Sequence, residues 1–271
     1  MRVCLLGPIR ISVAGHDVRL TGGLQHALLV ALASEAGRIV STNSLIEAMW
    51  GDHPPNSANV KVQGIVSSLR KALVRTGLCG ADDRWPLHTC DPGYAFSAEG
   101  VTVDLLQYRV LLGQATDELA AGQLMLASDL LSEALALWSG PAIAGLRLRT
   151  PILCAMADAL EGNRLQTIER KARCDLQLGR YEMVADQLSG FVAANPLREG
   201  MRAALMLALF RCGCCADALE YYRKGRQLLR EQLGIEPSPP LRRLHELMLS
   251  GATEFDMLAC LIDAVQPVVA M

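Results

Sequence analysis

Apolar residues recur at helical spacing between residues 57 and 73, and the opposite side of the same segment is polar. With 100° per residue, Val66, Leu69 and Leu73 fall within about 40° of Val62. Such a stripe has to be covered by a core, so the spacing predicts one amphipathic helix. Its outward positions are small, polar or cationic: Val60, Lys61, Gln63, Gly64, Ser67, Ser68, Arg70 and Lys71.

This outward face has the chemistry of a helix that reads DNA. Amides and hydroxyls can hydrogen-bond base edges in the major groove, and cations can contact phosphates. The alternative is an ordinary amphipathic helix whose cationic face is solvated. The helix alone favours neither interpretation, so the flanking segments have to decide.

Short strands and two further helices surround this helix in the first hundred residues. Residues 2–7, 9–13 and 18–20 predict two or three short antiparallel strands. Helical spacing follows from Leu24 to a stop near Gly37, and Ser41 is placed to cap a second helix. Asp91-Pro92-Gly93 predicts a hairpin turn. Together these elements predict an α+β winged helix-turn-helix in which the hairpin is the wing.

The second half of the chain shows helical patterns only. Asp104 is placed to cap the first helix, and patterns follow at about 123–138, 152–178, 181–194, 197–212, 215–233 and 239–250. Gly179 and Gly213 interrupt them 34 residues apart, the period of tetratricopeptide repeats. This predicts an all-α, tetratricopeptide-like region. Residues 251–271 suit a short amphipathic helix that caps the last pair or joins a dimer interface, or else a frayed tail.

Charge adds modest support for a nucleic-acid partner. The whole chain has a net charge of −2, while residues 1–100 hold nine Lys/Arg against eight Asp/Glu, a net of +1. That is a weak electrostatic signature for DNA binding. The clustering of Lys61, Arg70, Lys71 and Arg75 on or just after one helix matters more than the total.

Little in the chain suggests catalysis, a cofactor or a membrane. Apolar runs are too short for a transmembrane span and no signal-peptide core begins the chain, so we expect a cytoplasmic protein with its cysteines as thiols. Cys212, Cys214 and Cys215 have no paired histidines to complete a zinc site, which favours incidental thiols over redox sensing. Phosphate-binding loops and nucleophile elbows are absent from the sequence. We expect no enzyme, no cofactor and no metal.

Several motifs, in order, resemble the Streptomyces antibiotic regulatory protein family, which combines an OmpR-type winged helix with a bacterial transcriptional activation domain. The resemblance covers roughly residues 3–250. The motifs in the first half are Leu5-Leu-Gly-Pro8, Trp50-Gly51-Asp-x-Pro-Pro55, Leu69-Arg70-Lys71-Ala-Leu73 and Pro92-Gly93-Tyr94. Those in the second half are Leu137-Trp138-x-Gly140-Pro141, Asn195-Pro196-Leu-Arg-Glu199 and Leu233-Gly-Ile-Glu-Pro237.

The resemblance implies a pathway-specific transcriptional activator of a secondary-metabolite (antibiotic) gene cluster. Its partners would be double-stranded promoter DNA, read at direct repeats, and the RNA polymerase holoenzyme. It would act as a homodimer or as tandem copies on DNA, with no membrane partner. The implied domains are a winged helix at 1–98, an activation domain at 101–250 and a tail at 251–271.

The candidate site residues fall into four groups. On the reading helix, Lys61, Gln63, Ser67, Ser68 and Lys71 are expected to face the groove. Phosphate contacts are expected from Gln25, His26, Arg70 and Arg75. Thr89 and Tyr94 are the candidates from the wing, although a packing role under the wing suits Tyr94 better. The loop residues Gly51, Asp52, His53 and Asn56 are expected to face RNA polymerase.

Four positions depart from the pattern of the family. Leu24, His26, Asn59 and Ser68 stand where basic or polar residues are usual, and each lost cation removes a possible phosphate contact. This supports an alternative hypothesis: a helical-repeat adaptor whose degenerate winged helix acts through protein partners. The salt dependence of DNA binding would separate the two.

Overall fold

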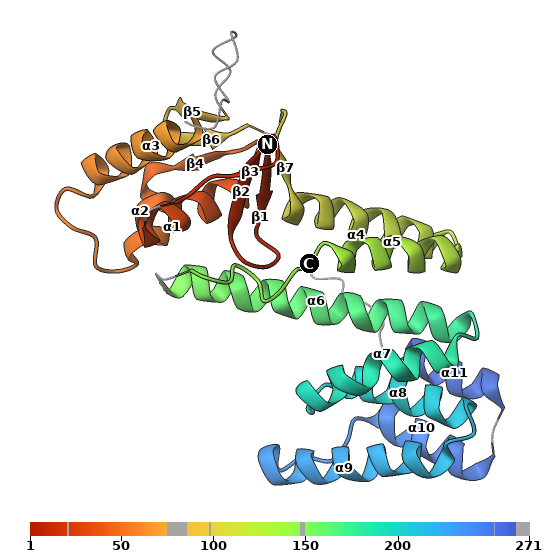
Figure 1. Cartoon of the computed structure of the whole chain (residues 1–271). Coiled ribbons are helices and arrows are strands. Elements are labelled where there is room, and N and C mark those ends of the chain that lie inside the picture. The colour runs from red at the N-terminus through yellow and green to blue at the C-terminus, as the bar shows by residue number, and fades with distance from the viewer. Residues whose placement is uncertain (21, 75–85, 98, 147–149, 252, 264–271) are drawn as a thin grey trace. The chain divides into compact units, whose positions relative to one another are not determined.

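The computed structural model describes residues 1–20, 22–74, 86–97, 99–146, 150–251 and 253–263 (Figure 1). They form two compact units. Unit 1 comprises Met1–Gly113 with Glu133–Leu165, and unit 2 comprises Gln114–Ser132 with Gln166–Met271. Among the described residues, no helix is both long and apolar enough to cross a membrane.

Unit 1 begins with a four-stranded sheet in the order β3-β2-β1-β7. The strands β1 (Arg2–Cys4), β2 (Arg10–Val13) and β3 (His16–Asp17) are antiparallel. The first two lie where strands were expected, whereas the third was expected at residues 18–20 and lies just before them. The expectation that the second half of the chain holds helical patterns only was wrong at residues 102–103. Residues Thr102–Val103 form β7, which pairs in parallel with β1 and buries Val103. Two residues are too few for a strand pattern to show in the sequence.

Three helices follow: α1 (Gly23–Ala33), α2 (Thr42–Trp50) and α3 (Ala58–Val74). Ser41 caps α2 as expected, because its side-chain oxygen accepts the N–H of Ser44 at 3.0 Å. The predicted stripe of α3 is buried in the core of unit 1, where it packs with residues of α1 and α2: Val62, Val66, Leu69 and Leu73. The opposite face of α3 lies outside this apolar core.

The wing is the hairpin of β5 (Leu87–Cys90) and β6 (Gly93–Phe96), which lies beside α3 in Figure 1. Strand β4 (Ile39–Ser41) pairs with β6 and completes a second sheet in the order β4-β6-β5. At Gly93 the two strands come so close that a β-carbon would overlap the carbonyl oxygen of Val40 and the backbone of Ser41. A glycine here fixes the hairpin against the start of α2.

A buried carboxylate joins the first helix of the second half to the first strand. Asp104 begins α4 (Asp104–Ala120) and is 2% exposed. Its oxygens accept the backbone N–H groups of Leu5 at 2.8 Å, Leu6 at 3.0 Å and Leu105 at 2.7 Å. Burial raises the pKa of the Asp104 carboxyl, while these three donors act to lower it. Asp104 thus does more than start a helix: it holds the segment that follows β1.

Helices make up the rest of the described chain. After α4 come α5 (Leu124–Ala136), α6 (Pro151–Gln177), α7 (Tyr181–Ala194), α8 (Glu199–Arg211), α9 (Cys215–Leu233), α10 (Pro239–Ser250) and α11 (Glu254–Asp263). In unit 2, α8 contacts α7, α9, α10 and α11 and is buried from Met201 to Ala208. A helix that is apolar on nearly every side is the centre of a core. The all-helical fold of this region is as predicted.

The predicted 34-residue repeat is visible in the backbone. Gly179 joins α6 to α7 with φ +74°, and Gly213 joins α8 to α9 with φ +83°. The next residues also match, with φ and ψ of −85° and 51° at Arg180 and of −83° and 53° at Cys214. Two helix hairpins therefore turn in the same way, as in tetratricopeptide-like repeats.

A buried ionic cluster ties three helices of unit 2 together. Asp175, near the end of α6, has no exposed surface. It accepts the hydroxyl of Ser128 from α5 at 2.7 Å, the Nζ of Lys171 at 2.6 Å and an Nη1–H of Arg180 at 2.9 Å. Arg180 immediately precedes α7. One carboxylate therefore meets groups from α5, α6 and the start of α7.

Candidate nucleic-acid interface

The outward face of α3 is exposed and carries no acid. Lys61, Gln63, Ser67 and Lys71 are all exposed, as the helical spacing predicted. Gly64 lies among them, and nothing lies within 4 Å of where its β-carbon would be. The helix from Ala58 to Val74 contains no Asp or Glu. This face offers an amide, a hydroxyl and two ammonium groups, and its own helix contributes no carboxylate that would repel a phosphate.

Gln25 does not face solvent, which corrects its assignment as a phosphate contact. The residue is 8% exposed, because the start of α1 packs across α3. Its side-chain Nε2 donates to the hydroxyl of Ser68 at 2.8 Å. Ser68 itself is exposed, but its oxygen is engaged by this bond. The pair fixes α1 against α3, so we assign both residues to positioning α3.

Arg70 is likewise used inside the unit rather than presented to a phosphate. Its Nε and Nη2 donate to the carbonyl oxygen of Leu87 at 3.1 and 2.9 Å, and Nη2 also donates to the hydroxyl of Thr89 at 2.9 Å. A forked guanidinium suits such a two-point contact. Arg70 thus fastens strand β5 of the wing to α3. Thr89 remains exposed beside this contact.

The remaining candidates for DNA contact also differ in how far they are exposed. His26 is half-buried, with Nδ1 2.9 Å from the carbonyl oxygen of Gly22. Tyr94 is 7% exposed and belongs to the core, which supports the packing role rather than DNA contact. Arg75 lies outside the described residues. Sequence reasoning also passed over exposed His88, whose outward position follows from its alternation with buried Leu87.

The loop between α2 and α3 is exposed at Asp52, His53 and Asn56. Gly51 is half-buried and has φ +59°, and its N–H closes α2 on the carbonyl oxygen of Glu47 at 2.8 Å. Gly51 therefore serves to end α2 in the required backbone conformation. Trp50 is half-buried against the core. Three side chains of this loop are free to meet a partner.

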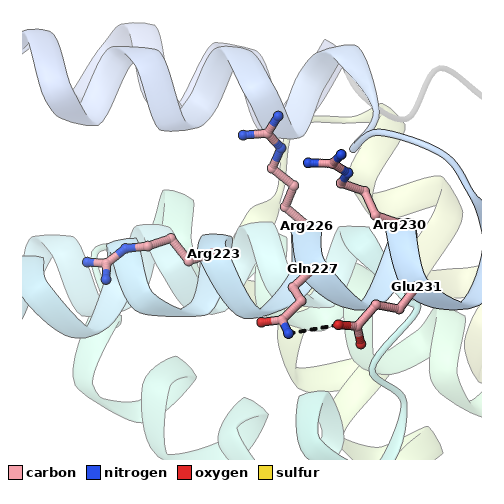
Figure 2. A pocket seen from close by; sticks show the side chains of 5 residues that line it. All are labelled: Arg223, Arg226, Gln227, Arg230 and Glu231. Atoms are coloured by element: carbon pink, nitrogen blue, oxygen red, sulfur yellow. Dashed lines mark hydrogen bonds between the residues drawn. The ribbon is translucent and has the colours of Figure 1, made fainter.

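Unit 2 has a pocket along α9 that is lined by charged side chains (Figure 2). Its lining residues are Arg223, Arg226, Gln227, Arg230 and Glu231, around a hollow of about 560 Å³. Arg226 and Arg230 point to one side of α9 (Figure 2). Both pair with Glu236, at 2.6 and 3.5 Å. This pairing raises the pKa of the Arg226 guanidinium and lowers that of the Glu236 carboxyl. The described lining residues all come from α9.

The cysteine cluster lies at the turn between α8 and α9. Cys212, Cys214 and Cys215 are exposed free thiols. Within the described part of the chain, no three His, Cys, Asp or Glu side chains are grouped to hold a metal ion. Burial, although slight, and nearby acids raise the pKa of the Cys212 thiol. That shift disfavours the thiolate, which is the reactive form.

A winged helix with an acid-free outward face, followed by stacked helix hairpins, defines a class of transcriptional regulator. Comparison with known families agrees. Residues 15–89 match the model of the transcriptional regulatory protein C-terminal domain, and residues 103–249 match that of the bacterial transcriptional activator domain. The chain belongs to the Streptomyces antibiotic regulatory protein family, whose members are transcriptional regulators rather than enzymes.

Three relatives illustrate the match. The regulatory protein DnrI of Streptomyces peucetius is 31% identical over 264 residues, which cover 94% of each chain. The regulatory protein AfsR of Streptomyces coelicolor is 37% identical over 93% of this chain, which spans only 24% of the length of AfsR. The solved structure of Mycobacterium tuberculosis EmbR, in complex with a low-affinity phosphopeptide, superposes with a TM-score of 0.86 at 31% identity. It covers 97% of this chain and 68% of EmbR.

Proposed function

We propose that this regulator binds promoter DNA in a sequence-specific manner and activates transcription of a secondary-metabolite gene cluster. In this proposal α3 enters the major groove of a direct repeat and the wing lies on the adjacent backbone. Exposed Asp52, His53 and Asn56 then contact RNA polymerase holoenzyme. Two or more copies, as a homodimer or in tandem, occupy the repeats. The proposed domains are 1–98 for DNA reading and 101–250 for activation, followed by the tail 251–271.

The observation that carries the proposal is the division of labour on α3. Its apolar stripe is buried, and the bonds from Gln25 and Arg70 fix its orientation towards α1 and the wing. Lys61, Gln63, Ser67 and Lys71 take no part in this and are exposed together. Side chains held on a rigid element and directed outward are suited to recognition.

Selection of DNA from a random pool by the purified full-length protein tests this directly. The enriched sequences are then titrated at two salt concentrations. We expect a short direct repeat whose affinity falls steeply with salt, because phosphate contacts release counterions. Weak binding at low salt without enrichment would contradict sequence-specific recognition.

One observation favours the adaptor alternative. Because Arg70 is engaged by the wing, Lys61 and Lys71 are the exposed cations of α3. Two ammonium groups supply little phosphate affinity to a single copy. The activator proposal meets this by binding tandem copies, whereas an adaptor would act through the helical region alone. Failure to enrich any DNA would favour the adaptor.

Lys71 provides a test of the phosphate contacts. We expect Lys71→Ala to weaken binding to all DNA sequences alike and to reduce the slope of log affinity against log salt by about one unit. Titrations of the variant and the parent at several salt concentrations measure this. Lys224→Ala, an exposed lysine of α9, is the matched control and should leave the slope unchanged. An unaltered slope in Lys71→Ala would remove Lys71 from the phosphate contacts.

Gly64 should show opposite effects on stability and on binding. Space is open around it, so Gly64→Ala should stabilise α3 by up to about 1 kcal/mol. The added methyl group would hold the helix away from the groove, and we expect about a tenfold loss of DNA affinity. Thermal unfolding and DNA titration give the two values. Gly113→Ala in α4, where space is also open, should stabilise without affecting DNA binding. Unchanged affinity in Gly64→Ala would place DNA elsewhere.

A further inference from the structure

The N-terminal end of the outward face of α3 holds an aliphatic residue that the proposed contacts do not use. Val60 is 67% exposed and is the third residue of the helix. It lies on the same side as Gly64, Ser67 and Lys71, which follow at helical spacing. Single exposed apolar residues are common on protein surfaces, so exposure alone says little. What has to be explained is why a valine lies within a face that otherwise consists of small, polar and cationic groups.

Neither helix propensity nor packing explains a valine at this position. A β-branched side chain lowers helix propensity relative to alanine or to long polar residues. The packed side of α3 is supplied by Val62 and its neighbours in the stripe, which are buried, whereas Val60 points away from them. A lysine or glutamine would serve a merely solvated face better.

The major groove presents one apolar group to a protein, the C5-methyl group of thymine. A recognition helix contacts base edges mainly with its N-terminal residues, which is where Val60 lies. One turn later, Gly64 has no side chain to prevent close approach. We propose that Val60 reads a thymine in each repeat by packing against its methyl group. This inference rests on the proposed DNA-binding function and adds a named base to it.

The test removes the methyl group and nothing else. In the DNA site selected by the full-length protein, each thymine is replaced in turn by deoxyuridine, which keeps every hydrogen-bonding group of the base. We expect one position in each repeat at which replacement weakens binding of the parent protein about fourfold, the value of one buried methyl-sized group. At that position Val60→Ala should bind thymine and uracil DNA equally.

Matched variants separate this contact from general effects. Val60→Ala should fold normally, because the side chain is exposed and alanine favours helices. Val110→Ala, at a valine of α4 that is 59% exposed, should retain the full preference for thymine. Val60→Thr keeps one methyl group at the same branch point and should retain part of it.

The outcomes separate a failure of DNA binding from a failure of the contact proposed for Val60. If the parent protein enriches no DNA, the proposed function itself fails. If it binds a selected site but tolerates uracil at every thymine, DNA binding stands and the role of Val60 is overturned. The same holds if Val60→Ala keeps the parent's sensitivity to uracil, as it would if Val60 faced a protein partner instead.

Discussion

Replacing Asp175 by asparagine should strongly destabilise unit 2. The substitution keeps the shape of the side chain but removes a fully buried charge that Lys171 and Arg180 meet at 2.6 and 2.9 Å. Loss of one partner leaves the other charges uncompensated, which typically costs about 3–5 kcal/mol. We expect the lower end of this range, because the Arg180 side chain is 34% exposed and can turn towards water. Urea unfolding followed by far-ultraviolet circular dichroism measures the loss.

The positions of the tryptophans allow the two units to be followed separately. The residue ranges of unit 2 contain no tryptophan, whereas Trp50 and Trp138 lie in unit 1. Asp175→Asn should therefore shift the circular-dichroism transition of the helical unit to lower urea and affect tryptophan fluorescence much less. Asp129→Asn, an exposed aspartate of α5, is the control and should have little effect. Equal stability of the two variants would show that the cluster does not stabilise unit 2.

Asp104→Ala should have an effect of similar size on unit 1. The substitution leaves the N–H groups of Leu5, Leu6 and Leu105 without their acceptor in a buried site. Each unsatisfied buried donor costs about 1–3 kcal/mol, so we expect a loss of at least about 3 kcal/mol. Here tryptophan fluorescence is the appropriate probe, since Trp138 is buried and packs edge-on against Tyr108 at 5.6 Å between ring centroids.

Asp17→Ala is the matched control for Asp104, because Asp17 lies in the same unit on β3 and is exposed. It should unfold at the same urea concentration as the parent protein. DNA binding by Asp104→Ala should fall only in proportion to the fraction of unfolded protein. Removal of urea, where it restores the fold, should also restore DNA binding. A fully folded Asp104→Ala protein that no longer bound DNA would point to a different role for this carboxylate.

The sequence predicted the helical region well because the information is local. The pattern at 152–178 corresponds to α6 at Pro151–Gln177, and the pattern at 215–233 coincides with α9. Apolar spacing marks each helix, and glycines such as Gly179 and Gly213 mark the turns by adopting positive φ. The outward face of α3 was predicted on the same basis, since a buried stripe defines the opposite side.

The errors concern partners distant in sequence. Gln25 is 43 residues from Ser68, and Arg70 is 17 residues from the carbonyl oxygen of Leu87 that it binds. A sequence shows what an amide or a guanidinium can do, but not whether another part of the fold already occupies it. Strand β7 was missed for the same reason, because it exists only through its pairing with β1, about a hundred residues earlier.

The parallel pairing of β1 with β7 has a consequence for any attempt to isolate the proposed DNA-binding domain, residues 1–98. A fragment that stops at residue 98 would lack both β7 and Asp104, and β1 would become the unprotected edge of its sheet. Unpaired edges invite strand exchange and aggregation between molecules. Transferring this module to another regulator, or expressing it alone for DNA studies, would therefore require the chain to continue well into α4. The first sheet therefore contains strands from both sides of the proposed domain boundary at residues 98–101. This boundary is not a simple linker.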